Sequence, residues 1–360
     1  MRVRFHIYYQ TVLLLMMAAV LLTACSSESS EAPTVPADKG STDHVLHLLS
    51  FASSYEELVS SHRAAPTGYS AYPLDKVTEM GIYMVLPADY TAPNVPTEQR
   101  IKYDGAKWHA YFSVDKDKTY SVYGYLPKAT GMSSSLSKST ADADAATLTI
   151  TGMKAVTTDD ICVITGAKET ETGLKEGSFS WYQAVTNDDY YIYMLLNHLY
   201  ASVRFSMKVD ADYAQLRTIK LKSMTLSTNQ GSVNATISLT HNTTGASPIS
   251  NVTYTASGDN DAVVIFNSDE GTALSQTTAT IVNAYFAPTS TLSSNLTLVS
   301  TYDLYDSKGN LIREGCTATN KIPDLEASRG QRVQLNLTVN PTYLYVLSDP
   351  DLDNPTITIN

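Results

Sequence analysis

Two stretches of sequence decide the fold: residues 202–209 read SVRFSMKV, and residues 217–227 read RTIKLKSMTLS. Apolar and polar side chains alternate strictly in the first stretch, and Ile219, Leu221 and Met224 lie near one face of the second. A period of two is typical of a strand with one face in a core and the other in solvent. Both stretches are therefore predicted to be β-strands.

Segments of the same kind extend toward both ends of the chain. Residues 81–86 (GIYMVL) form an apolar run that Pro87 ends, as in a fully buried strand. Residues 108–114 and 120–126 flank four charged turn residues, which predicts a hairpin. Further strand-like segments recur at short spacing as far as residues 332–339. Such a series is typical of sandwiches and barrels.

The composition agrees with an acidic, strand-rich globular protein of two domains. The 360 residues include 43% hydrophobic residues, and 25 Lys+Arg against 36 Asp+Glu give a net charge of -11. An acidic balance argues against a nucleic-acid partner. Tyr (24 residues) outnumbers Phe (7) and Trp (2), and tyrosine suits a half-wet pleated surface. We therefore predict an all-β protein with two tandem β-sandwich domains, residues 44–196 and 197–340.

The N-terminus carries an export signal. Arg2 and Arg4 precede an apolar stretch, residues 11–22, that is too short to span a membrane. The stretch ends in Leu22-Thr23-Ala24-Cys25, and small residues directly before a cysteine resemble the bacterial lipobox. A plain secretory signal with a coincidental cysteine is the alternative.

A lipobox implies a lipoprotein. Residues 1–24 are then a signal peptide, and Cys25 carries a diacylglycerol with fatty-acid chains such as palmitate, which anchor the protein in a membrane. Residues 25–43 are rich in Ser, Glu and Pro and contain too little apolar surface to fold. They are predicted to be a tether.

The last twenty residues, 341–360, form a tail of two strand-like pieces. Pro341 is expected to interrupt pairing, and residues 349–355 (DPDLDNP) are expected to separate the two pieces. The tail is either folded back as edge strands or is a donor segment for another molecule, because an exposed apolar strand templates pairing with an open sheet edge. The residues that would pair are Tyr343, Leu344, Tyr345, Val346, Leu347, Ile357 and Ile359.

Enzymatic motifs are weak. His44 and His47 are spaced as H-x-x-H, without a carboxylate or cysteine at metal-ligand spacing. The sequence contains no Gly-x-Ser-x-Gly, P-loop or Gly-x-Gly-x-x-Gly motif. Cys162 and Cys316 are interpreted as buried small hydrophobes and not as a disulfide pair. We therefore predict no enzyme activity, no metal site and no cofactor.

Several motifs, in their order, resemble the fimbrillin family of Bacteroidetes, the subunits of major and minor fimbriae (type V pili). They are the lipobox, residues 101–108 (IKYDGAKW) leading to residues 120–127 (YSVYGYLP), residues 196–205 (LNHLYASVRF) and the strand at residues 330–340. The resemblance covers nearly the whole chain. It implies two transthyretin-like β-sandwich domains with a C-terminal strand extension. It also implies export as a surface-exposed outer-membrane lipoprotein and polymerisation with like or unlike fimbrial subunits into a fimbrium that contributes to cell adhesion.

The resemblance also implies proteolytic maturation. In fimbrillins an Arg-specific surface protease removes the lipidated N-terminus together with the first strand, and a strand from a neighbour's C-terminal tail fills the groove. The matching cut site is Arg63, in a polar loop after the apolar segment 44–55, which makes residues 44–63 a propeptide. Arg100 is the competing site, but a cut there would also remove the predicted strand at 81–86.

A surface glycan-binding lipoprotein is the alternative function. Trp108, Trp181 and Tyr182 would then be exposed and would act as stacking platforms for sugar rings. Both functions require acidic β-domains on a lipid tether.

Overall fold

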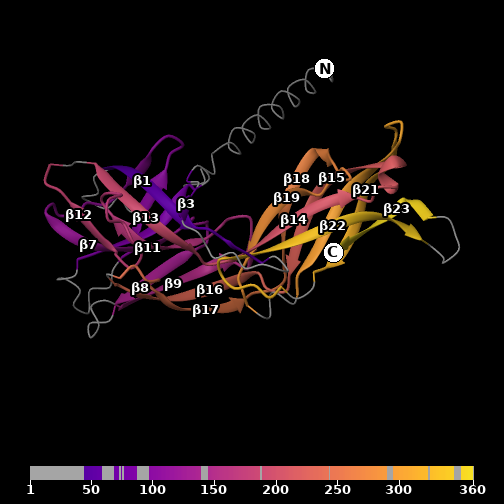
Figure 1. Ribbon diagram of the computed structural model, residues 1–360. Coiled ribbons are helices and arrows are strands. Elements are labelled where there is room, and N and C mark those ends of the chain that lie inside the picture. The colour runs from indigo at the N-terminus through magenta and orange to yellow at the C-terminus, as the bar shows by residue number, and fades with distance from the viewer. Residues whose placement is uncertain are drawn as a thin grey trace, which may run out of the picture. The chain divides into compact units, whose positions relative to one another are not determined.

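The computed structural model describes residues 44–58, 69–72, 74, 77–86, 97–138, 145–186, 189–242, 244–289, 295–322, 325–343 and 350–359. These residues form β-strands almost throughout, with a 3₁₀ turn at Tyr213–Gln215, so the all-β prediction is confirmed (Figure 1). None of the described helices has the length and apolar character needed to pass through a bilayer.

The largest sheet, here called the ring sheet, closes on itself. Its strands follow the order β11-β13-β1-β6-β5-β4-β7, and β11 also pairs with β7, which completes the ring. β3 pairs with β1, and β12 pairs with β7. The bounds are β1 His44–Ser53, β3 Tyr69–Ala71, β4 Glu79–Val85, β5 Gln99–Tyr103, β6 Trp108–Ala110, β7 Lys118–Leu126, β11 Cys162–Lys168, β12 Ser180–Gln183 and β13 Tyr190–His198.

The ring sheet buries side chains on both faces of its strands. Along β7, Val122 and Leu126 belong to one apolar cluster, here called the ring core, to which all seven ring strands contribute. Tyr123 and Tyr125 of the same strand belong to a second and larger cluster, the main core. This alternation is the period of two that a pleated strand imposes. A strand buried on both faces contains few charged residues, as β7 does.

Three further sheets surround the main core. The six-stranded sheet has the order β10-β19-β14-β22-β2, with β23 also on β22; the β15 sheet has the order β18-β15-β20-β21; and the linking sheet has the order β17-β16-β9-β8. Their bounds are β2 Glu56–Leu58, β8 Ser133–Lys138, β9 Ala145–Lys154, β10 Val156–Thr157, β14 Ala201–Val209, β15 Arg217–Thr228, β16 Ser232–Thr240, β17 Ile249–Ser257, β18 Asp261–Ala273, β19 Ala279–Phe286, β20 Thr297–Asp306, β21 Leu311–Lys321, β22 Gln331–Tyr343 and β23 Pro350–Ile359.

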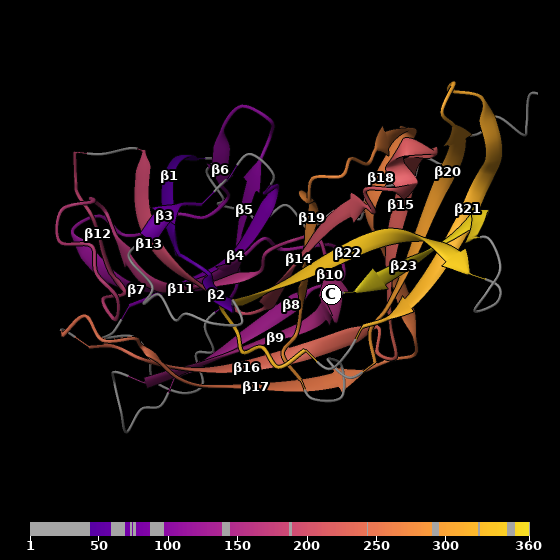
Figure 2. The same ribbon diagram turned by 45° about the vertical axis from the view of Figure 1, so that its right-hand side comes forward.

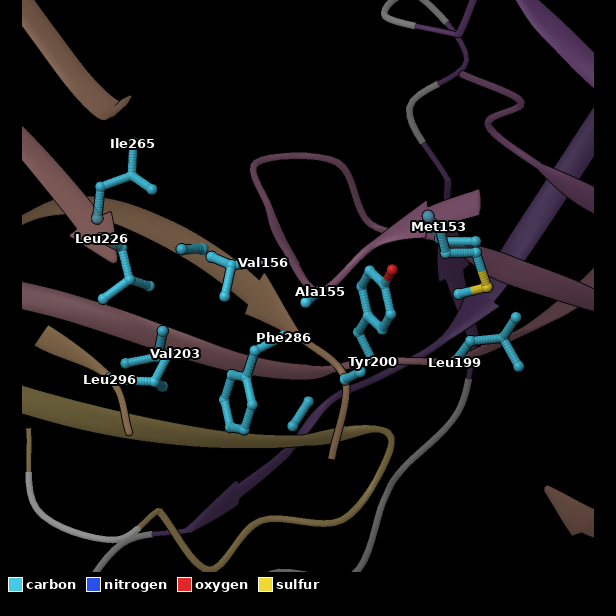
Figure 3. Close-up of a cluster of buried hydrophobic side chains, with 14 of the residues drawn as sticks. Met153, Ala155, Val156, Leu199, Tyr200, Val203, Leu226, Ile265, Phe286 and Leu296 are labelled. Carbon is cyan, nitrogen blue, oxygen red and sulfur yellow. The ribbon is translucent and has the colours of Figure 1, made fainter. Parts of the chain in front are cut away.

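Figure 3 shows the main core where these sheets meet. Val203 of β14, Leu226 of β15 and Phe286 of β19 are buried there. Tyr200, between β13 and β14, is also fully buried, and its hydroxyl donates to the carbonyl of Lys154 at 2.5 Å. Burial raises the pKa of Tyr200 well above its ordinary value, so the hydroxyl stays a donor.

The linking sheet takes strands from both sides of the domain boundary predicted at residue 197. β9 of the first half pairs with β16 of the second half, over register partners that run from Ala145↔Thr240 to Lys154↔Ser232. The predicted boundary itself falls at the end of β13. The two halves therefore share a sheet, and a division into two transthyretin-like domains remains a prediction.

Three local predictions are wrong. Residues 349–355 were expected to separate two strand-like pieces of the tail, but β23 is one continuous strand from Pro350 to Ile359. The segments at 108–114 and 120–126 do not form a hairpin, because β6 pairs with β5 and β1 while β7 pairs with β4, β11 and β12. Pro341 does not end its strand either, since β22 continues to Tyr343. The ladder between β22 and β23 shifts register at Pro341, and an irregularity tolerates a residue that has no N–H.

Candidate functional site

The first described strand, β1, is paired on both of its edges within the ring sheet. It pairs in parallel with β13 along residues 46–52, and in antiparallel fashion with β6 along residues 44–46. Leu46 and Ala52 are buried in the ring core, and Leu48 packs against it. β1 thus contributes both backbone pairing and core side chains, as the predicted removable first strand would.

The strand that follows, β2, lies against a different sheet. β2 pairs in parallel with β22 at residues 331–333, and β23 pairs in antiparallel fashion with β22 at residues 337–343. β14 pairs with the opposite edge of β22. The N-terminal segment and the C-terminal tail therefore occupy consecutive stretches of one edge of β22, and Figure 2 shows them toward its two ends.

The tail is folded back onto its own chain as an edge strand, which is one of the two alternatives predicted from the sequence. Ile357 is buried in the main core and Ile359 packs against it. Side chains on the other side of β23 donate to its carbonyls: Asn320 Nδ2 to Ile357 O at 2.6 Å, and Arg313 Nη1 to Asp353 O at 2.9 Å. These donors come from β21, so β22 is the strand that holds β23 by a backbone ladder.

A cluster of polar side chains, here called the His198 cluster, surrounds the end of β1. It consists of Ser53, Tyr55, Asp160, Cys162 and His198. His198 Nε2 lies 2.5 Å from the carbonyl oxygen of Ser53 and must donate to it, because a carbonyl only accepts. His198 Nδ1 lies 3.0 Å from Asp160 Oδ1 and 3.4 Å from Cys162 Sγ. The cluster joins β1 to β11 and β13.

Two tyrosines complete the surroundings of Asp160. The Tyr55 hydroxyl donates to Asp160 Oδ1 at 2.7 Å, and its ring stacks on His198 with the centroids 3.8 Å apart. The Tyr72 hydroxyl donates to the Asp160 carbonyl at 2.7 Å. Burial, with a contribution from Asp160, raises the pKa of Tyr55 well above its ordinary value. Burial and then Asp160 also raise the pKa of the Cys162 thiol, so each remains protonated unless a cation is near.

A cavity of about 400 Å³ opens beside this cluster. Asp160, His198, Tyr55 and Tyr72 contribute to its wall, together with Arg332, whose guanidinium carbon lies 4.7 Å from the centre of the Tyr55 ring. Cys162 and His198 are themselves buried. Asp160 and His198 thus line the cavity, whereas Cys162 does not.

The residues predicted for processing fall outside the described part of the chain. Cys25, Arg63 and residues 344–347 are not among the described residues. Tyr343 ends β22, and Ile357 and Ile359 lie in β23. Cys162 begins β11, Cys316 lies in β21, and neither forms a disulfide.

The structure contradicts the exposure on which the glycan-binding alternative depends. Trp108 and Trp181 are buried in the ring core, and Trp181 Nε1 donates to the carbonyl of Tyr191 at 2.8 Å. Their rings cannot serve as platforms for sugars, because their faces are covered. The tyrosine of the trio, Tyr182, is 39% exposed. Trp is favoured at sugar-binding surfaces and in cores alike, and the sequence alone did not separate the two.

Little in the amino-acid sequence indicated the His198 cluster. His198 and Cys162 are register partners across the β11–β13 ladder, although they are far apart along the chain. Asp160 lies two positions before Cys162, a spacing that also occurs at ordinary strand starts. Only the pairing of β11 with β13 brings the three side chains together.

No protein-family model and no curated protein sequence matches the chain. Among solved structures it is similar to a fimbrial protein from Bacteroides vulgatus (TM-score 0.35, 14% identity, covering 88% of this chain and 98% of that one). It is also similar to a fimbrial protein from Bacteroides ovatus (TM-score 0.33, 12% identity, covering 86% of this chain and 53% of that one). A third similar structure is the fimbrial anchor protein Mfa2 from Porphyromonas gingivalis (TM-score 0.25, 12% identity, covering 87% of this chain and 97% of that one).

Proposed function

We propose that the chain is a structural subunit of a surface fimbrium that contributes to adhesion and assembles by strand exchange. The observation that carries this proposal is the position of β1. It is the first described strand of the chain, yet both of its edges are paired inside the ring sheet. One cut between β2 and β3 separates it from the rest of the chain and breaks no other described strand.

Loss of β1 would leave a groove that another strand can fill. The facing edges of β13 and β6 would lose their backbone partners, and the ring core would lose Leu46, Leu48 and Ala52. Burial of each large apolar side chain contributes roughly 1.5–3 kcal/mol, so an open groove is unstable in water. Unpaired strand edges of this kind recruit an added strand.

The C-terminal tail supports the complementary half of the proposal. Ile357 and Ile359 have the two-residue spacing of Leu46 and Leu48 on β1, so a strand that carries them can direct both side chains to one face. A tail held by the single ladder to β22 can leave without breaking the interior of a sheet. Tyr343 to Leu347 are the other proposed donor residues.

Processing connects these two elements. We propose that Cys25 is lipidated and holds the precursor at the outer membrane, and that an Arg-specific surface protease then cuts at Arg63. That cut would remove β2 together with β1, and so would clear residues 331–333 of β22 next to the tail. The partners of the processed chain are other fimbrial subunits.

The test is an assembly assay on the purified precursor. Incubation with an Arg-specific protease is expected to give ladder-like multimers that survive detergent without boiling. Arg63→Ala and deletion of the whole tail, residues 341–360, should each abolish the ladder, whereas Arg100→Ala, at the competing site, should leave it unchanged. A ladder that forms as well from the Arg63→Ala chain would contradict the proposed trigger.

A further inference from the structure

Three side chains of metal-ligating type meet at the end of β1. Asp160 Oδ1, Cys162 Sγ and His198 Nδ1 all lie within 4.8 Å of one another. The separations are 3.0 Å (Asp160 to His198), 3.4 Å (Cys162 to His198) and 3.8 Å (Cys162 to Asp160). Tetrahedral zinc, with bonds of about 2.0 Å to N or O and 2.3 Å to S, sets neighbouring ligand atoms roughly 3.3–3.6 Å apart. The observed separations bracket this range.

The tautomer of His198 also suits a metal ligand. Its Nε2 atom carries a hydrogen, because it faces the carbonyl of Ser53 at 2.5 Å. A neutral imidazole then presents a lone pair from Nδ1, directly at a carboxylate oxygen and a sulfur. The Nδ1 lone pair and Asp160 Oδ1, 3.0 Å apart, repel one another unless a positive charge lies between them. A second proton on the ring or a bound cation can supply that charge.

The surroundings match those of a metal centre. A ligating histidine usually donates its other N–H to a backbone carbonyl or a carboxylate, and a ligating carboxylate usually accepts a further hydrogen bond. Here the carbonyl of Ser53 and the hydroxyl of Tyr55 fill those two positions. The adjoining cavity has room for water as a fourth ligand.

The charges also balance. One carboxylate, one thiolate and one neutral imidazole around a divalent ion give a net charge of zero, which a buried site tolerates. Zn²⁺ would displace the thiol proton of Cys162 and any second proton of His198. Mg²⁺ and Ca²⁺ prefer oxygen ligands, whereas a set of thiolate, imidazole and carboxylate suits Zn²⁺.

We propose that Asp160, Cys162 and His198 bind Zn²⁺, and that the ion fixes the end of β1 through the hydrogen bond from His198 to Ser53. The site is independent of the proposed function, since it requires only the pairing of β11, β13 and β1. In a chain that polymerises, the bound ion would hold β1 in place; in one that does not, it would still stabilise the ring sheet.

The test uses the full-length chain with Cys25→Ser, so that the lipidation thiol cannot bind metal. The reduced, metal-free protein is titrated with Zn²⁺ against a chromophoric chelator. One equivalent is expected to bind. Cys162→Ala and His198→Gln should each weaken binding by at least about 100-fold, because they remove a ligand. Cys316→Ala, the matched cysteine control, should leave the affinity unchanged. Equal affinity in Cys162→Ala, or no binding to the parent chain, would overturn the proposal.

A second measurement tests whether Cys162 is a metal ligand even if the Cys162→Ala variant does not fold. The chain with both Cys25→Ser and Cys316→Ala keeps Cys162 as its one thiol. Co²⁺ bound to it should give the near-ultraviolet charge-transfer band of a cobalt thiolate, and Zn²⁺ should displace that band. Zn²⁺ should also slow amide exchange at residues 50–55. Bound Co²⁺ without the thiolate band would show that Cys162 is not a ligand.

Discussion

His198 Nε2 donates a 2.5 Å hydrogen bond to the carbonyl of Ser53, and this bond joins the last residue of β13 to the last residue of β1. The two strands run in parallel from Leu46↔Tyr190 to Ala52↔Leu196, so the bond continues their ladder beyond its last register pair. The end of β1 nearest the predicted cut is therefore held by a buried side chain.

Replacement of His198 should loosen that end of β1. His198→Ala removes the donor to Ser53, and loss of a buried hydrogen bond costs about 1–3 kcal/mol. We expect a lower free energy of unfolding in urea and faster amide exchange at residues 50–55. His47→Ala is the matched control, because His47 is exposed on the same strand and its ion pair with Asp189 is a surface pair. Similar effects from the two variants would contradict this role of His198.

The packing of β1 against the ring core predicts a contrast between two leucines. Leu46 is 3% exposed, whereas Leu311, at the start of β21, is 51% exposed. Leu46→Ala should lower the free energy of unfolding by about 2–5 kcal/mol, through lost burial and the cavity left behind. Leu311→Ala should change it by less than about 0.5 kcal/mol. Equal losses in chemical denaturation would mean that β1 is not part of the core.

The tail strand, β23, should be less protected against amide exchange than β14, an interior strand of the same sheet that pairs with β19 and β22. β23 has a backbone ladder on one edge, to β22, while β22 is also paired with β14. Amides of β23 are therefore expected to exchange through local opening, well before those of β14. Ile357→Ala should widen the difference, because Ile357 is buried in the main core. Equal protection of β23 and β14 would contradict a releasable tail.

The turn that joins β5 to β6, the strand next to β1, predicts a pH effect. Asp104 accepts hydrogen bonds from the N–H groups of Lys107 and Ala106 and faces His109, and these contacts lower the pKa of Asp104 to about 2. Ionised Asp104 thus supports the turn above its ordinary pKa, and the support is lost as the pH falls toward 2. An NMR titration of the Asp104 carboxyl should have its midpoint well below the ordinary 3.8, and a midpoint at 3.8 would contradict the turn geometry.

Local patterns in the sequence predicted the strands better than their partners. The segments predicted at 81–86, 202–209, 217–227 and 332–339 correspond to β4, β14, β15 and β22. Closure of the ring by β11 and β7, and the linking sheet that β9 and β16 form, depend on partners that the period of two does not identify. Pro341 was predicted to stop a strand because the sequence does not reveal the register shift that accommodates it.

For the candidate site too, the sequence predicted the strands but not their partners. The first strand and the tail were predicted from apolar segments at the two ends of the chain, and β1 and β23 are there. Their shared relation to β22 was not predictable, because it arises from two separate ladders. The glycan-binding alternative placed Trp108 and Trp181 at the surface, whereas both are buried. The identity of an aromatic residue in a strand does not show which face of the sheet it occupies.

The most direct test of the account is a reversible lock on β1. Val45 of β1 and His109 of β6 are register partners, so Val45→Cys with His109→Cys should place a disulfide across that ladder. The chain is oxidised, cut with the Arg-specific protease and assayed for multimers, with each single variant as a control. Strand exchange predicts monomers while the disulfide is intact and multimers once it is reduced. Multimers that form equally well before reduction would contradict the departure of β1.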